Sequence, residues 1–470
     1  MTAVVMPDAA VAPPLAGPCS SAAECAGGVC VEMPRDGQRC MPSCVSDADC
    51  HGDDRYVCDS QWHACTLPNT TALVAPNCPT PTGFGRDPAF APPTALTTTG
   101  TQTQPSAVVA DDGTLIALYL AEANTLAIAR IDLANRLETV ALPATTASEP
   151  RLARDARGKL YAVWISAGRD VMLATSDDRG TTWSAPRVAS DPEDCASTIG
   201  VCVSAPVVIA GIGPRKEAIV YVAYAADGMR VRASRDGGAT FAAAKTPLAG
   251  NRGNLAIGST GLLYVVAING GPRGEYGSGD HRIEFAASGD GGASFTRPQG
   301  VSRYGEMLPF AASNPSIVVD DKRKWIYLAY TRGGRDAKWD LVIVASKDFG
   351  KTWTRARIGD DPACAIHMVP NLALDPLTGA LHAAWYDSRG LRFAHAVCLP
   401  GAVGCRQVGR INDTPLAALS LARGLPRSVG ESEALVVDSA RRTLHAVWAQ
   451  PIDDAGRIVA RVMHARARLK

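Results

Sequence analysis

After about Thr94, apolar and polar residues alternate in short runs separated by turns rich in Gly, Pro, Asn and Asp. A typical unit begins at a Pro or Asn, passes through a D-x-x-G-like turn, and returns in a run that ends in an aromatic residue. This alternation, with many β-branched residues, predicts paired strands. The unit occurs seven times, at intervals of roughly fifty residues. The copies begin at Pro105, Pro150, Pro206, Asn254, Pro315, Asn371 and Glu433.

A second pattern, Ser-x-Asp-x-Gly-x-Thr/Ser-aromatic, follows the third apolar run of four units, as SDDRGTTW, SRDGGATF, SGDGGASF and SKDFGKTW. Its Gly supplies the positive φ of a hairpin turn, and its Ser and Asp can bond the amides of that turn. The final Trp or Phe can pack beneath the hairpin. The key residues are Ser176, Asp178, Gly180, Trp183, Ser234, Asp236, Gly238, Phe241, Ser288, Asp290, Gly292, Phe295, Ser346, Asp348, Gly350 and Trp353.

The paired-strand unit and the Ser-Asp-Gly turn recur at the same interval. Together they predict an all-β protein, a propeller of four-stranded blades. The first repeat forms strands a and b of each blade, and the Ser-Asp-Gly turn joins c to d. Seven blades are favoured and six are the alternative. Blade one has Asn135 near its turn, and Cys398 and Cys405 could close the hairpin of blade six. Blade seven lacks a fourth strand, which residues 94–99 could supply so that few strand edges stay free.

The four turns resemble the Asp-box of the BNR-repeat, sialidase-like β-propellers. Sialidases bind a substrate carboxylate with three arginines, and use a Tyr paired with a Glu as nucleophile and an Asp as acid/base. That chemistry needs bidentate guanidinium groups and a carboxylate that activates the phenol. The chain lacks the Arg-Ile-Pro signature that opens the sialidase propeller, and GFGRDPAF around Arg86 matches it poorly. Sialidase propellers also have six blades.

Fourteen cysteines indicate an oxidising compartment. Eight of them, from Cys19 to Cys65, fall into two similar halves and predict a disulfide-rich module over 19–66, although their pairing stays open. It resembles the small Cys-rich modules of exported bacterial proteins, and a zinc site is the less favoured alternative because C-x2-C spacing is lacking. Residues 1–18 would be a disordered tether, 67–93 a Pro/Thr-rich linker, and 94–470 the propeller. The remaining pairs proposed are Cys195 with Cys202, Cys398 with Cys405, and Cys78 with Cys364.

The charge balance gives no sign of a nucleic-acid or anionic-membrane partner, since 47 basic residues face 46 acidic ones for a formal charge of +1. No apolar run approaches the ~18 residues of a membrane span. The first residues lack the basic region and apolar core of a signal peptide, so we expect a leader outside this sequence. The protein is predicted to be secreted, periplasmic or on the cell surface, and to be a monomer.

Two long loops, 268–282 and 300–314, lie at the end of the propeller opposite to the Ser-Asp-Gly turns, where loops on a rigid scaffold usually carry function. The catalytic candidates are Glu275, Tyr276, Asp280, Tyr304 and Glu306. The ligand-binding candidates on this rim are Arg151, Arg252, Arg273, Arg282, Arg303, Arg335 and Arg389. No metal or other cofactor is predicted, because the histidines are scattered without ligand spacing.

Two functions follow from these residues. The favoured one is an exported propeller without catalysis that binds a glycan, peptide or protein through its loops. The alternative is a sialidase-like exo-glycoside hydrolase that uses an Arg cluster, a Tyr/Glu nucleophile pair and an Asp acid/base. Seven blades and the missing Arg signature favour binding, whereas the four turns and the Arg/Tyr/Glu-bearing loops favour hydrolysis.

Overall fold

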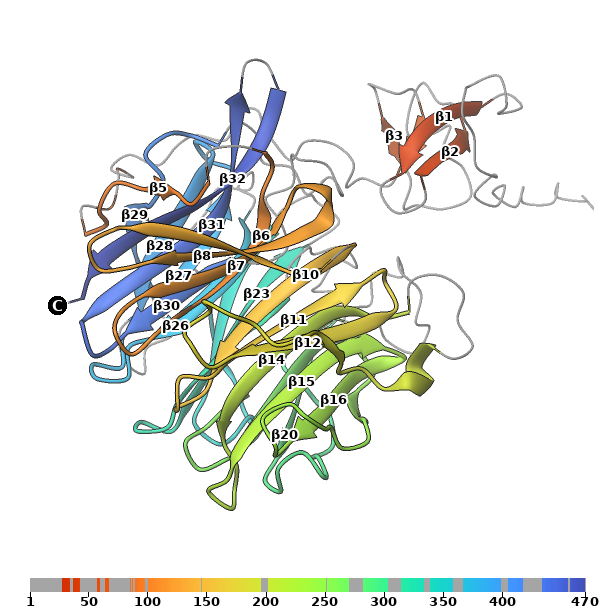
Figure 1. Cartoon of the computed structure of the whole chain (residues 1–470), viewed down its shortest axis with the longest axis vertical. Coiled ribbons are helices and arrows are strands. Elements are labelled where there is room, and N and C mark those ends of the chain that lie inside the picture. The colour runs from red at the N-terminus through yellow and green to blue at the C-terminus, as the bar shows by residue number, and fades with distance from the viewer. Residues whose placement is uncertain are drawn as a thin grey trace, which may run out of the picture. The chain divides into compact units, whose positions relative to one another are not determined.

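A computed structural model divides the chain into two units, shown in Figure 1: Met1–Val74 with Ala418–Ser428, and Ala75–Ala417 with Val429–Lys470. It describes residues 28–33, 37–42, 57–59, 64–66, 85, 87, 89–97, 100–144, 146–195, 202–250, 252–269, 282–302, 314–333, 339–357, 367–398, 405–416, 433–454 and 457–469.

The described part of the first unit consists of two β-hairpins. Strand β1 (Gly28–Met33) pairs with β2 (Gly37–Pro42), and β3 (Val57–Asp59) pairs with β4 (Ala64–Thr66). The registers place Cys30 opposite Cys40 and Cys58 opposite Cys65. These strands are described by their backbone alone, so the predicted disulfide pairing of the eight cysteines lies outside the described part of the structure.

The second unit is a seven-bladed β-propeller, because its strands form seven antiparallel sheets of four strands each. This confirms the prediction of four-stranded blades and decides for seven over six. Blades one to three consist of β6 (Thr103–Val109), β7 (Leu115–Ala121), β8 (Thr125–Ile131) and β9 (Leu137–Leu142); β10 (Ala147–Arg154), β11 (Leu160–Ser166), β12 (Asp170–Ser176) and β13 (Arg187–Val188); and β14 (Ser204–Ile212), β15 (Ala218–Ala226), β16 (Gly228–Ser234) and β17 (Lys245–Leu248).

The remaining blades have the same order of strands, with two short 3-10 helices, η4 (Glu122–Asn124) and η5 (Pro192–Cys195), in earlier connections. Blades four to seven consist of β18 (Arg252–Ile257), β19 (Leu263–Asn269), β20 (Arg282–Ser288) and β21 (Gln299–Gly300); β22 (Ser316–Asp320), β23 (Trp325–Gly333), β24 (Trp339–Ser346) and β25 (Thr354–Arg357); β26 (His367–Leu374), β27 (Leu381–Asp387), β28 (Arg392–Cys398) and β29 (Cys405–Arg410); and β30 (Ala434–Asp438), β31 (Thr443–Asp454), β32 (Arg457–Arg468) and β5 (Thr94–Ala95).

Blade seven is completed from the other end of the propeller chain. Strand β5 pairs with β32, with Ala95 opposite Met463, and the amide of Leu96 donates to the carbonyl of Val462 over 2.8 Å. The preceding residues are also fixed to the last blades: Phe90 forms a β-bridge with Ala467, and Asp87 Oδ2 lies 2.9 Å from His395 Nδ1. The end of the Pro/Thr-rich segment 67–93 is therefore part of the ring closure.

The apolar core lies between neighbouring blades. One cluster joins blades four and five through Tyr264, Phe285, Leu328 and Tyr330. Trp353, the aromatic residue that ends one of the Ser-Asp-Gly turns, packs edge-on against Phe285 of the preceding blade, with ring centroids 5.4 Å apart. Each blade thus buries its apolar surface against two others, which explains why a closed ring is needed.

The Ser-Asp-Gly turns share one geometry. In the first, Ser176 Oγ donates to Asp178 Oδ1 (2.8 Å) and accepts from Gly180 N (2.9 Å), while Thr182 N donates to the same carboxylate (2.8 Å). The other three turns repeat these bonds. Each connects strands c and d. We call this end of the propeller, with the a–b and c–d turns, the turn face, and the opposite end the loop face.

Two blades without the turn use other means. Cys398 and Cys405 face each other across β28 and β29 and form a disulfide, with Cα atoms 4.0 Å apart. In blade one, Asn135 takes a φ of 62° and its amide donates to the carbonyl of Asp132 over 3.0 Å. Among the described residues, no helix has the length and apolarity needed to cross a membrane.

Candidate binding site in the central channel

The innermost strands place one equivalent residue of each blade around the propeller axis. The β-ladders define the equivalence: Ser106 pairs with Leu118 just as Arg151 pairs with Val163 in the next blade. We call these residues the axial ring, and all of them line one cavity of about 200 Å³. The ring consists of Ser106, Arg151, Val207, Asn254, Ser316, Asn371 and Ala434.

Three ring side chains also join neighbouring blades. Each accepts a hydrogen bond from the amide that follows the ring residue of the next blade. These bonds run from Leu152 N to Ser106 Oγ (3.0 Å), from Leu372 N to Ser316 Oγ (3.0 Å) and from Leu435 N to Asn371 Oδ1 (3.2 Å). Val207 has no acceptor to offer, and Asn254 Oδ1 instead accepts from the amide of Leu255 (2.8 Å). The polar ring residues are therefore held in fixed orientations.

A β-bulge precedes the ring position in four blades, at a residue followed by Pro. These residues adopt left-handed backbone conformations that a following proline disfavours, at a cost of about 1–3 kcal/mol each. They are Gln104 (φ 55°), Glu149 (φ 53°), Ala205 (φ 50°) and Val369 (φ 53°). Gln104 Oε1 accepts from Glu149 N (2.9 Å), and Glu149 Oε2 accepts from Ala205 N (2.6 Å). Strained backbone thus surrounds the channel just before the ring.

Glu433 occupies in blade seven the place that Pro105, Pro150 and Pro370 occupy elsewhere, and it lines the same cavity. Its Oε1 contacts the hydroxyl of Tyr386, and its Oε2 accepts from the amide of Ala449 over 3.0 Å. Burial raises the pKa of Glu433 well above its usual 4.5, and the bonds from Tyr386 and Ala449 and the charge of Arg151 offset this only in part.

Arg151 and Glu433 are the ionisable members of the described cavity lining. The guanidinium of Arg151 also donates to the carbonyl of Pro150 over 2.9 Å. Because Ser106 and Ser316 act as acceptors for amides, their hydroxyl hydrogens remain for other acceptors. Asn314 Oδ1 is buried and accepts no hydrogen bond from the described residues. Aliphatic side chains such as Val208, Ile209 and Val436 complete the wall, a mixture typical of small ligand sites.

Of the predicted ligand-binding residues, Arg151 is the one whose side chain the structure places in this cavity. Arg389 is buried in the b–c turn of blade six, where its Nε and Nη2 bind both oxygens of Asp387 at 3.0 and 2.7 Å. Arg282 donates to Glu284 Oε1 over 2.9 Å. Arg252 begins β18, two residues before the ring residue Asn254. The positions Arg273, Arg303 and Arg335 lie outside the described residues.

The predicted catalytic residues Glu275, Tyr276, Asp280, Tyr304 and Glu306 lie outside the described residues as well. The Tyr–Glu pair that the structure does describe beside the cavity is Tyr386 with Glu433. Burial and the adjacent carboxyl raise the pKa of Tyr386 well above 10, and its side chain is fully buried. A nucleophile needs access to substrate and a partner that removes its proton. Tyr386 does not meet the first condition, because its side chain is fully buried.

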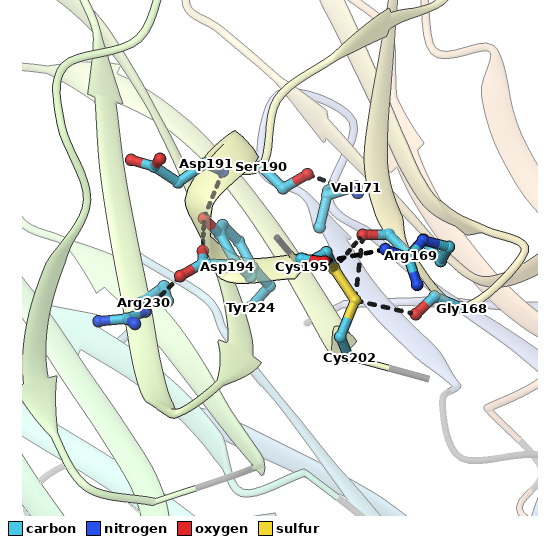
Figure 2. The surroundings of a disulfide bond; sticks show 10 residues. All are labelled: Gly168, Arg169, Val171, Ser190, Asp191, Asp194, Cys195, Cys202, Tyr224 and Arg230. Atoms are coloured by element: carbon cyan, nitrogen blue, oxygen red, sulfur yellow. Dashed lines mark hydrogen bonds and ion pairs between the residues drawn. A yellow bond between two sulfur atoms is a disulfide. The ribbon is translucent and has the colours of Figure 1, made fainter. Parts of the chain in front are cut away.

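On the loop face, the segment before blade three is attached to blades two and three (Figure 2). Cys195 and Cys202 form a disulfide, with Cα atoms 5.7 Å apart, and Arg169 Nη2 donates to the carbonyl of Cys195 over 2.9 Å. Tyr224 donates to Asp194 Oδ2 (2.6 Å), and Asp194 pairs with Arg230 (2.9 Å). These contacts give the loop face a rigid rim at this junction.

The third predicted cysteine pair, Cys78 with Cys364, lies outside the described residues. Within the described ranges, no group of three or more His, Cys, Asp or Glu side chains is placed to hold a metal ion. Buried histidines form two pairs instead, His382 with His395 (3.2 Å) and His445 with His464 (3.1 Å), at equivalent places in blades six and seven.

No protein-family model and no curated protein matches the chain. Solved propellers are similar in fold at low identity. YCF48 bound to D1 peptide is 14% identical, over 85% of this chain and 99% of its own, with a TM-score of 0.48. The SapL1 lectin in complex with alpha methyl fucoside is 12% identical over 68% and 98%, with a TM-score of 0.42.

The intramolecular trans-sialidase from Ruminococcus gnavus, in complex with oseltamivir carboxylate, is 11% identical, over 63% of this chain and 92% of its own, with a TM-score of 0.43. These similarities concern a fold that serves binding proteins and enzymes alike, so the function must be argued from the site.

Apart from Arg151, the residues of the axial ring are not among those that the sequence predicted as ligand contacts. Its signal is present in the sequence, because Ser106, Arg151, Ser316 and Asn371 each directly follow a proline that opens a strand. The repeat marks where the inner strands begin. Recognising that the next residue points at the axis requires the register of all seven blades.

Proposed function

We propose that this protein is an exported, Asp-box-type propeller that binds a glycan, peptide or protein ligand through its loop face, with a group of the ligand entering the central cavity. The observation that carries the proposal is the axial ring. It combines fixed hydroxyl and amide groups with one guanidinium in a cavity of about 200 Å³, which is sufficient for a single residue of a larger ligand.

Further features support binding over hydrolysis. The ring side chains are oriented by bonds between blades, so the cavity is formed before a ligand arrives, which lowers the cost of binding. The described Tyr–Glu pair is buried and poorly suited to nucleophilic attack. The fourteen cysteines and the disulfides Cys195–Cys202 and Cys398–Cys405 are consistent with export to an oxidising compartment.

The test is a screen of immobilised glycans and synthetic peptides against the full chain, followed by variants. Arg151→Gln should weaken binding of any ligand found by roughly tenfold or more, because it removes the guanidinium group that lines the cavity. Arg136→Gln is the matched control, since Arg136 is exposed on the turn face beside Asp132. Equal binding by both variants would contradict the cavity as the site. Release of dye from a fluorogenic sialoside would favour the hydrolase instead.

A further inference from the structure

Three buried side chains are linked in a row where the N-terminal side of the propeller meets blade six. Oδ2 of Asp87 lies 2.9 Å from Nδ1 of His395, and Nε2 of His395 lies 3.2 Å from Nδ1 of His382. Asp87 precedes β5, His395 is in β28 and His382 is in β27. We propose that this row, which we call the acid–histidine chain, is a pH-sensitive switch that holds Asp87 and its neighbours on blade six only while both imidazoles are neutral.

The number of hydrogens explains why the acid–histidine chain favours neutral rings. An ionised carboxylate only accepts hydrogen bonds, and a neutral imidazole has one donating and one accepting nitrogen. His395 therefore donates from Nδ1 to Asp87, and its Nε2 accepts from Nδ1 of His382. Both contacts are then satisfied, and a lone pair remains at Nε2 of His382, which is buried without a hydrogen-bond partner among the described residues. We therefore expect both rings in the Nδ1–H tautomer.

An added proton has no suitable position while the acid–histidine chain is intact. On either ring it leaves a hydrogen on the buried Nε2 of His382, and on Asp87 it would face the N–H of His395. Burial, followed by repulsion from a charged His395, lowers the pKa of His382 to about 4. The other charged groups that act on this ring are Asp87, Asp375 and Arg442, and the last two pair with each other over 2.7 Å. Proton uptake therefore favours a state in which the contacts are broken and the rings reach water.

The switch acts on residues that join the N-terminal side of the propeller to blade six. The amide of Asp87 donates to the carbonyl of Arg410 over 2.8 Å, and the amide of Arg410 donates to the carbonyl of Gly85 over 3.1 Å. Phe90 packs edge-on against the ring of His395, with ring centroids 5.2 Å apart. When the acid–histidine chain opens in acid, these contacts should be released together, whereas blade three should keep its own sheet.

The arrangement of protons is tested by NMR of the full chain, labelled with nitrogen-15 in histidine, at about pH 7. The rings of His395 and His382 should both give the signals of the Nδ1–H tautomer, since Asp87 fixes the direction of both hydrogen bonds. The variant His382→Phe assigns the second ring by removing its signals. A charged ring, or the Nε2–H tautomer in either histidine, would overturn the proposal.

The switch is tested by hydrogen exchange of the amides of Asp87 and Arg410, corrected for the intrinsic effect of pH. The folded pKa of His382 is below its unfolded value of 6.5, so its stabilising effect is present above that value and is lost as pH falls towards about 4. The opening constant of wild type should therefore rise by up to about tenfold per pH unit in this range, as uptake of one proton predicts. The reference is β15 of blade three, whose protection should stay high.

The variant His382→Phe should abolish this rise, because it removes the ring that takes up the proton. The same ladder position holds an aromatic ring in other blades, at Tyr161, Tyr221, Tyr264 and Tyr327. The matched control is His445→Phe, the equivalent change in blade seven, which should keep the rise. An unchanged rise in His382→Phe would contradict the switch. So would an equal loss of protection in β15 of wild type, a comparison that needs no variant.

Discussion

At the scale of single residues, position decides what a side chain does more than its type. Glu433 and Glu149 are both glutamates near the start of an inner strand, but Glu149 accepts the bulge amide of Ala205 while Glu433 contacts a phenol and an amide. Arg151 lies in the cavity and Arg389 binds Asp387, although both were predicted as ligand contacts from their place on the rim.

The raised pKa of Glu433 makes stability depend on pH in a definite direction. A carboxyl whose pKa is higher in the folded state stabilises the fold fully below its unfolded value of about 4.5, and this contribution is lost as pH rises towards the folded pKa. Relative to Glu433→Gln, wild type should therefore lose up to about 1.4 kcal/mol of unfolding free energy per pH unit above about pH 4.5.

Urea unfolding of the two proteins at a series of pH values measures this difference, and the titration of all other groups cancels because both proteins share them. Parallel pH profiles would show that Glu433 has an ordinary pKa in the folded protein.

At the scale of elements, the Ser-Asp-Gly turn is stabilised by its own residues. The carboxylate of Asp178 accepts from the side chain of Ser176 and from the amide and hydroxyl of Thr182, all within four residues. These bonds lower the pKa of Asp178 by more than its partial burial raises it. Because the contacts are local, the motif alone was enough to predict the turn.

Asp178→Ala should destabilise the propeller by about 1–2 kcal/mol, since it removes three hydrogen bonds that order a hairpin. Asp177→Ala is the matched control, because the neighbouring side chain is exposed and pairs with Lys159 on the surface. We expect a change below about 0.5 kcal/mol there. Urea unfolding of both variants at neutral pH measures these changes. Similar losses of unfolding free energy in the two variants would mean that Asp178 has no special role in the turn.

At the scale of the whole molecule, the ring is held at the junction where the two ends of the propeller chain meet. Leu96 follows β5 and packs in a buried cluster with Leu115 and Ala117 of blade one and Val447 and Val462 of blade seven. Polar contacts on the turn face join the same blades, since Arg441 Nη2 donates to the carbonyl of Asp111 over 2.7 Å.

Leu96→Ala should therefore cost about 2–4 kcal/mol, as for a buried leucine whose cavity cannot collapse. Leu137→Ala provides the comparison, because Leu137 is an outer-strand leucine of blade one with 44% of its surface exposed. Its loss should be below about 1 kcal/mol. Denaturant unfolding of the full chain gives both values. A loss as small for Leu96 as for Leu137 would show that strand β5 does not secure the closure.

The sequence by itself determined the features that depend on short range and on repetition: strand alternation, the Ser-Asp-Gly turns, seven units, and the need for a strand near Thr94 to complete blade seven. Each of these features follows from hydrogen bonds between neighbouring residues or from the regular spacing of apolar residues, and the structure agrees with all of them.

Only the tertiary structure decided the site. The axial ring joins residues from seven blades, from Ser106 to Ala434, and no local pattern records that they share one axis. The raised pKa of Glu433 likewise depends on its burial, and on Tyr386, Ala449 and Arg151, which are distant in sequence or lie on other strands. This burial is a property of the assembled ring, because the carboxyl group loses its hydration only when all the blades close around the channel.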